Sequence, residues 1–224
     1  MTRNRPSASD FRALAHLAFP ITLVQVGMMA MGVVDTMIVG RISAAALAGV
    51  AVGTVYVFAL GSLGMGFLTA VEPVMAQAIG AGEPRAVARA FQRGIVLTGA
   101  LGVFAALMIL PIGPVLRAFG QSPALIEVAV VYAHVQMPAM VAFYAFVLLR
   151  QSLQAQGPPR PIVVTIVLAN LLNALLAWAL VFGHLGAPAL GVWGAGLATT
   201  LARFANALLL LALAWRDLRP LFVW

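Results

Sequence analysis

Long apolar runs, separated by short polar turns, make up most of the chain. The first run, Ala13 to Val39, holds one acidic side chain, Asp35, and no arginine. Because an α-helix rises about 1.5 Å per residue, such a run can cross a hydrocarbon core of about 30 Å. The pattern predicts six membrane-spanning helices, over residues 13–39, 44–79, 86–116, 124–154, 161–182 and 189–215. Pro20 predicts a kink in the first helix, and Pro111 and Pro114 predict a break in the third.

The composition supports this assignment. Hydrophobic residues make up 63% of the chain and charged residues only 8%, whereas an ordinary soluble domain has about 25% charged residues. The sequence therefore predicts an all-α polytopic membrane protein. The first apolar run is too long for the core of a signal peptide and contains an acid, so we expect no cleavable signal. The chain has no cysteine, which excludes disulfides and thiolate metal sites.

The basic residues indicate how the chain is oriented. All 13 are arginines, and most lie before the first helix, around the second and fourth loops, and after the last helix. These arginines are Arg3, Arg5, Arg12, Arg85, Arg89, Arg93, Arg150, Arg160, Arg216 and Arg219. The other loops carry only Arg41 and Arg117, so the positive-inside rule places both termini in the cytoplasm. We expect a cytoplasmic segment over 1–12, a six-helix lobe over 13–215 and a cytoplasmic tail over 216–224.

A carboxylate inside a membrane span is the strongest functional signal in the sequence. Facing lipid, Asp35 would cost about 2.5–3.5 kcal/mol or more, so we expect it to face a protein interior or a water-filled cavity. In the predicted orientation Asn170, Asn173 and Thr199 also lie in the middle or outer half of the membrane. The sequence predicts that they converge with Asp35 on a proton- or cation-binding site. The alternative is that they only form hydrogen bonds between helices or to backbone carbonyls.

Four more polar residues lie within predicted spans. Glu72 and Gln77 lie near the cytoplasmic end of the second helix. We expect them to form part of a cytoplasmic gate or of a packing network. Gln25 predicts a cavity lining or a core hydrogen bond, and Arg203 needs an interior partner unless it extends to the membrane surface. The methionines of Met28–Met31 could form an adaptable apolar surface for ligands. The alternative is that they occupy ordinary core or lipid-facing positions.

The sequence contains no catalytic constellation. It has no phosphate-binding loop, no nucleophile beside a base and no pair of carboxylates at one depth. His16 and His134 have no metal-ligating partner at a useful spacing, so a sodium ion at Asp35 is the one metal that we expect. We therefore predict a protein that is not an enzyme, needs no cofactor and lies in the lipid bilayer. The net charge of +7 is explained by membrane orientation rather than by nucleic-acid binding.

Four stretches, in this order, resemble the amino-terminal half of a multidrug and toxic compound extrusion (MATE) transporter. They are Val33–Gly40 with Ala45–Ala48; Pro73–Gly82; Leu149–Gly157; and Leu172–Ala174 with Leu180–Gly183 and Leu190–Thr199. Together they extend over nearly the whole chain. Similar phrases at Gln77–Gly80 and Gln154–Gly157 suggest a duplication of three plus three helices.

The resemblance implies a twelve-helix antiporter of two six-helix lobes in a bacterial inner membrane. Such a protein exports organic cations in exchange for protons or sodium ions. Asp35 matches the acid of the family's first helix and Asn173 matches a polar residue of that site. Ala177 stands where relatives often have Asn or Asp, which disfavours sodium coordination in this lobe.

The second lobe implied by the resemblance is absent from the sequence. We expect a fragment, a truncated reading frame or half of an assembly with a second six-helix half. Two alternatives remain at this point: a flippase for lipid-linked oligosaccharides from the same superfamily, and a non-transporting scaffold or remnant.

Overall fold

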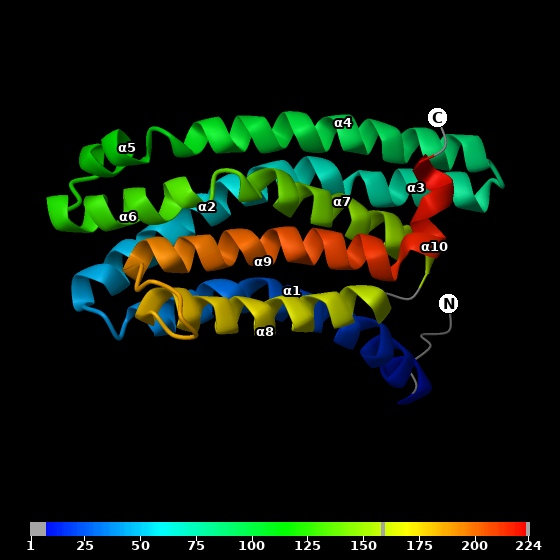
Figure 1. The fold of residues 1–224 in the computed structure, drawn as a ribbon. Coiled ribbons are helices and arrows are strands. Elements are labelled where there is room, and N and C mark those ends of the chain that lie inside the picture. Colours follow the sequence, from blue (N-terminus) through cyan, green and yellow to red (C-terminus); the bar gives the residue numbers. More distant parts are fainter. Residues whose placement is uncertain (1–7, 158–159, 223–224) are drawn as a thin grey trace.

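The computed structural model describes the backbone of residues 8–157 and 160–222, and in this part of the chain helices joined by short loops are found, with no strand. The helices are α1 (Ala8–Val39), α2 (Ala44–Thr69), α3 (Val71–Gly80), α4 (Pro84–Ile109), α5 (Ile112–Ala118), α6 (Pro123–Val135), α7 (Ala139–Gln156), α8 (Arg160–Phe182), α9 (Gly191–Leu213), α10 (Trp215–Leu218) and the 3₁₀ turn η1 (Arg219–Phe222). They pack side by side in layers, with α4 on one side of the bundle and α8 and α1 on the other (Figure 1). The predicted all-α fold is confirmed.

Each predicted span corresponds to one helix or to a consecutive pair. Among the described residues, four stretches are long and apolar enough to cross a membrane, namely Ala44–Gly80, Pro84–Ile109, Pro161–Phe182 and Gly191–Leu213. The bent pair of α6 and α7 makes a fifth, and α1 contributes the apolar stretch Val24–Val39. The start of α1 and the helix α10 lie at the same end of the bundle, as an even number of crossings requires (Figure 1).

Prolines interrupt three of the predicted helices. The break between α4 and α5 at Pro111 was predicted. The prediction of single helices over 44–79 and 124–154 was wrong in detail, because α2 and α3 are separated at Ala70 and α6 and α7 meet at 56°. Pro73 and Pro138 each lack the N–H that would bond to the carbonyl four residues earlier. At Pro20 the first helix continues without a break.

Small residues bring α2 and α6 close together. A Cβ atom built on Gly49 would overlap the side chain of Val128, and one on Gly53 would lie 3.0 Å from the ring of Tyr132. Gly49 and Gly53 are four residues apart, so they lie on one face of α2. This close approach positions α6 for the site described below.

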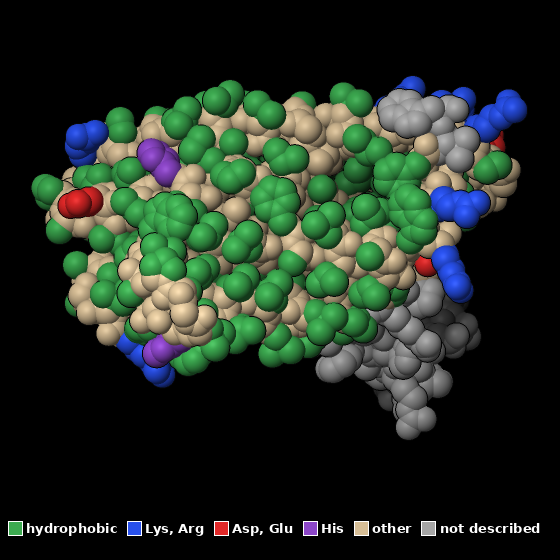
Figure 2. Space-filling view, in the orientation of Figure 1, with side chains coloured by type: hydrophobic (Ala, Val, Ile, Leu, Met, Phe, Trp, Pro, Cys, Tyr) green, Lys and Arg blue, Asp and Glu red, His purple; other side chains and the backbone are tan. Residues whose placement is uncertain are grey.

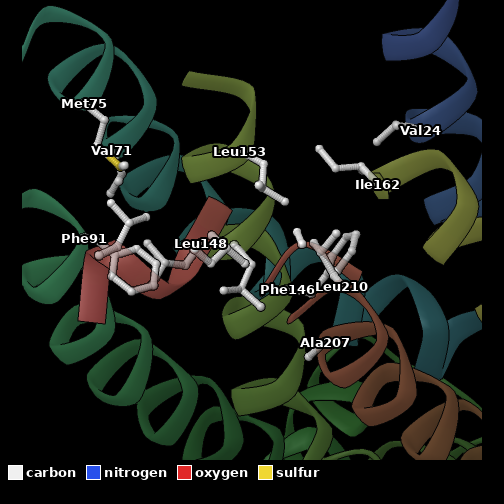
Figure 3. Packing of buried hydrophobic residues seen from close by; sticks show 14 of the residues in the cluster. Val24, Val71, Met75, Phe91, Phe146, Leu148, Leu153, Ile162, Ala207 and Leu210 are labelled. Atoms are coloured by element: carbon white, nitrogen blue, oxygen red, sulfur yellow. The ribbon is translucent and has the colours of Figure 1, made fainter. Parts of the chain in front are cut away.

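The last described residues, which precede position 223, pack onto the lobe. Leu218 and Leu221 are buried, and the ring of Phe222 meets that of Phe91 on α4 at a centroid distance of 5.0 Å. They belong to a cluster of buried apolar side chains that also joins α3, α7, α8 and α9 (Figure 3). The prediction that this segment begins a linker to a second lobe stays untested.

The surface agrees with a membrane environment. On the visible face, hydrophobic side chains extend over the middle of the bundle and basic side chains lie at its two ends (Figure 2). More basic side chains gather at the end that carries the α3–α4 loop and α10. This distribution is what the positive-inside rule predicts when that end is cytoplasmic.

Candidate functional site

Asp35, one turn before the end of α1, is fully buried. Its Oδ2 accepts hydrogen bonds from the hydroxyl of Tyr132, at 2.7 Å, and from the hydroxyl of Thr199. Its Oδ1 accepts one from Asn173 Nδ2 at 3.3 Å, and the same nitrogen lies 3.3 Å from Thr199 Oγ1. The donors come from α6, α8 and α9, so the carboxylate connects three helices to α1. The structure thus brings Asp35, Asn173 and Thr199 together as expected, while their binding of an ion stays a prediction.

Tyr132 is the donor that sequence reasoning missed. It is buried between Gly53 of α2 and Gly196 of α9, and its hydroxyl accepts a hydrogen bond from Thr54 of α2 at 3.3 Å. A polar chain therefore runs from Thr54 through Tyr132 to Asp35. Its depth in the membrane could have pointed to Tyr132, because it lies in the half of the fourth span that the predicted orientation places near Asp35.

A cavity of about 470 Å³ lies beside this cluster. Its walls come from α1, α2, α8, α9 and the bent pair of α6 and α7, and most of the lining is apolar. The methionines and phenylalanines that line it are Met28, Met29, Met31, Met37, Phe58, Phe143 and Phe146. Tyr132 and Thr199 line the cavity and Asp35 does not, so these two donors stand between the carboxylate and the cavity.

Asn170 is not part of the Asp35 cluster. Its Nδ2 donates to the backbone carbonyl of Gly27 on α1 at 2.9 Å and to that of Ile166 at 2.8 Å. A Cβ atom on Gly27 would overlap Ile166, so the two helices touch at this glycine. Asn170 also lines the cavity. Its hydrogen bonds go to backbone carbonyls, which is the alternative that the sequence left open for this residue.

Arg150 lies inside the lobe, although its position in the sequence suggested a loop arginine. It is 7% exposed, and its Nη1 donates to Gln25 Oε1 on α1 at 3.3 Å and lies 3.3 Å from Met28 Sδ. The negative charge of Glu72 on α3 stabilises the guanidinium. The arginine bias that orients the chain therefore rests on the other arginines.

The predicted gate residues occupy different places. Glu72 is half-buried near the start of α3, whereas Gln77 on the same helix is exposed. Gln25 is also exposed and is not among the residues that line this cavity, and its described contact is the hydrogen bond from Arg150. Arg150 thus links α7 to α1 through its hydrogen bond with Gln25, and Glu72 on α3 acts on the same guanidinium through its charge. A gating role for this contact stays a prediction.

Arg203 has the interior environment that the sequence required. It lines the cavity, with Nη1 at 3.9 Å from Met140 Sδ and Cζ at 5.5 Å from the centroid of the Phe143 ring. The side chain is thus directed into the lobe.

Two of the three histidines, His134 and His184, have described side chains. In the described part of the chain, no group of three or more His, Cys, Asp and Glu residues could hold a metal ion. His134 Nε2 lies 3.4 Å from the carbonyl oxygen of Leu110, and the ring of His184 stacks on Trp178 at 4.2 Å. The side chain of His16 lies outside the described residues.

The fold is that of a polytopic helical membrane protein, and a buried carboxylate beside a cavity between helices is a feature of transport proteins. The MatE family model matches residues 20–179. A probable multidrug resistance protein NorM from Bradyrhizobium diazoefficiens is 35% identical over 221 residues, which cover 96% of this chain and 47% of that protein. A second NorM, from Rhizobium meliloti, is 32% identical and covers 85% of this chain and 41% of its own length.

The fold comparison agrees with the sequence comparison. The crystal structure of the eukaryotic MATE transporter AtDTX14 superposes with a TM-score of 0.82 at 25% identity, over 92% of this chain and 45% of that one. The chain therefore belongs to the MATE family, whose members are transporters. It spans about half the length of the curated relatives that it matches, and it corresponds to their amino-terminal half.

Proposed function

We propose that this chain is the amino-terminal lobe of a secondary active exporter that moves drug-like organic cations out of a bacterial cell through the inner membrane, with both termini in the cytoplasm. The observation that supports this most is Asp35. The carboxylate is fully buried, held by donors from three helices and separated from a large cavity by Tyr132 and Thr199. A change in its charge would change the packing of α1 against α8 and α9 and so the shape of the cavity.

The coupling ion is a proton or a sodium ion. A carboxylate, a hydroxyl and an amide are suitable ligands for sodium, and the same carboxylate can carry a proton. Ala177, one turn after Asn173, is buried and offers no further ligand, which favours the proton. Arg203 is the one charged side chain among the described residues of the cavity lining, which favours drug-like substrates over the phosphate-rich head group of a lipid-linked oligosaccharide.

The cavity needs a second wall. Met29, Met37 and Phe58 line it and are each more than half exposed in this lobe, which leaves that side open. Transporter sites form between two repeats, so we propose that a second six-helix half closes the cavity.

The test is efflux by the exporter completed by that second half, in proteoliposomes with an imposed proton gradient in sodium-free buffer, and then with a sodium gradient. Asp35→Asn keeps the shape of the side chain but cannot change charge, so gradient-driven efflux should be lost while insertion into the membrane is retained. Asp217→Asn, an exposed acid on α10, is the matched control and should export normally. Wild-type efflux by Asp35→Asn would show that this acid is structural.

A further inference from the structure

The one charge that lines the cavity is positive. Arg203 is the single charged side chain in the described lining, and its two close contacts there are a thioether and an aromatic ring. Neither Met140 nor Phe143 carries a negative charge, and at 3.9 Å the sulfur is a weak acceptor. The guanidinium therefore presents several N–H donors to the cavity without a carboxylate to receive them.

Asp35 acts on Arg203 only through space. Thr199 and Arg203 are four residues apart on one face of α9, which places the guanidinium about one turn from the Asp35 cluster. Both oxygens of Asp35 already accept hydrogen bonds, and Tyr132 and Thr199 separate them from the cavity. The ionisable groups that act on the guanidinium are Asp35 on α1, Tyr132 on α6 and Tyr144 on α7.

A ligand with an anionic group would supply the missing partner. A half-buried guanidinium without an ion pair is costly, and a carboxylate can accept two parallel hydrogen bonds from it. The methionines and phenylalanines of the wall provide an apolar surface for a ring system.

We propose that Arg203 is a specificity-determining residue that binds an anionic group of the ligand. The cavity of this lobe then prefers aromatic compounds that carry a carboxylate in addition to a cationic group over the same compounds without the carboxylate. This inference rests on the proposed function, because it assumes that exported compounds enter this cavity, and it narrows the substrate class from organic cations to zwitterions.

A pair of dyes tests the inference on the 224-residue chain itself. Rhodamine 110 carries a free carboxylate, and rhodamine 123 is its methyl ester and a plain cation. Binding of each dye to the purified chain in detergent micelles is measured by fluorescence anisotropy, with protein-free micelles as the blank. We expect the wild-type chain to bind rhodamine 110 about tenfold more tightly than the ester, because only the free carboxylate can accept charge-assisted hydrogen bonds from Arg203.

Variants assign the preference to one residue. Arg203→Gln should bring the ratio of the two affinities to about one, chiefly by weakening rhodamine 110 binding, whereas Arg203→Lys should keep part of the preference because it keeps the charge. Arg117→Gln, at an exposed position on α5 away from the cavity, is the matched control and should leave the ratio unchanged. Asp35→Asn should raise the ratio, because it removes the negative charge nearest to the guanidinium.

The outcomes separate this inference from the proposed function. Equal or tighter binding of the ester by the wild-type chain, or an unchanged ratio in Arg203→Gln, would overturn the role of Arg203 and leave a cation exporter intact. If neither dye binds in a way that depends on the lining residues, this lobe holds no such ligand and the inference is overturned, whereas the proposed exporter, whose cavity a second half completes, is decided by the efflux test above.

Discussion

The three tyrosines of the chain allow the Asp35 site to be tested by its contribution to stability. Each tyrosine hydroxyl donates one hydrogen bond to another helix or segment: Tyr132 to Asp35 Oδ2 at 2.7 Å, Tyr144 to the carbonyl of Leu60 at 2.9 Å, and Tyr56 to the carbonyl of Met108 at 2.8 Å. Replacing tyrosine by phenylalanine removes the hydroxyl and retains the ring. The three variants therefore compare one acceptor that carries a charge with two that are neutral.

The expected magnitudes follow from the acceptors. The bond from Tyr132 is buried and ends on a carboxylate, so Tyr132→Phe should lower the free energy of unfolding by about 1.5–3 kcal/mol. Thr54 loses its acceptor in this variant but can bond to a carbonyl of its own helix. Tyr56→Phe and Tyr144→Phe each remove a bond to a neutral carbonyl, which is worth about 0.5–1.5 kcal/mol.

The assay is equilibrium unfolding of the purified chain in mixed micelles of a mild detergent and dodecyl sulfate. Unfolding is followed by the fluorescence of the four tryptophans and by circular dichroism, and both signals should give the same midpoint. If Tyr132→Phe is no more destabilising than Tyr56→Phe, then the hydroxyl does not bond to an ionised Asp35, and the assignment of Asp35 as a charged acceptor under these conditions is wrong.

Three further predictions concern packing, topology and assembly. Gly49→Ala should destabilise the chain by about 1–3 kcal/mol in the same assay, because the new methyl group meets Val128, whereas Gly66→Ala has open space and should be neutral or stabilising by up to about 1 kcal/mol; equal effects would contradict the close packing of α2 and α6. Leu185→Cys, in the exposed α8–α9 loop of a cysteine-free chain, should react with a membrane-impermeant maleimide from outside the cell, and reaction only from the cytoplasmic side would reverse the predicted orientation. The purified chain, shown to be monomeric, should not drive efflux from vesicles, and coupled efflux by the monomer would show that the cavity needs no second wall.

Depth along the membrane could be predicted from the sequence, and this was enough to find Asp35 and two of its three hydrogen-bond donors. Apolar runs and arginines give the spans and their direction, which placed Asp35, Asn173 and Thr199 at comparable depth. Asn170 has a suitable depth too, but it bonds to the backbone of α1 and not to Asp35. The sequence does not give the rotation of each helix, because helices that are apolar on nearly every side show no stripe that marks the inner face.

The features that sequence reasoning missed also have physical explanations. Arg150 lies near the end of its span, where an arginine usually reaches the membrane surface, and only the packing of α7 against α1 shows that it is buried. Tyr132 carries no charge at neutral pH, so it did not stand out among apolar neighbours. It becomes visible as a site residue once glycines of α2 and α9 are seen to let α6 pack closely against these two helices.

The bend between α6 and α7 leads to a last prediction. Pro138 has no N–H to bond to the carbonyl of His134, and the N–H of Ala139 bonds to Gln136 in place of Val135. The carbonyl of Val135 is thereby freed from the helix, and it accepts a hydrogen bond from Thr200 on α9 at 2.9 Å. The side chain that bonds to the freed carbonyl at the bend thus comes from α9, the helix that also carries Thr199 and Arg203.

Thr200→Val keeps the shape of the side chain and leaves this partly buried carbonyl without a partner, which should cost about 1–3 kcal/mol in the unfolding assay. In a Pro138→Ala background the helix can continue and the Val135 carbonyl can bond to its own chain, so Thr200→Val should then cost less than about 1 kcal/mol. A double-mutant cycle measures this coupling, and the single variants are its controls. If the cost of Thr200→Val is the same with Pro138 and with Ala at position 138, the hydrogen bond does not compensate for the proline, and the bend must be fixed by packing alone.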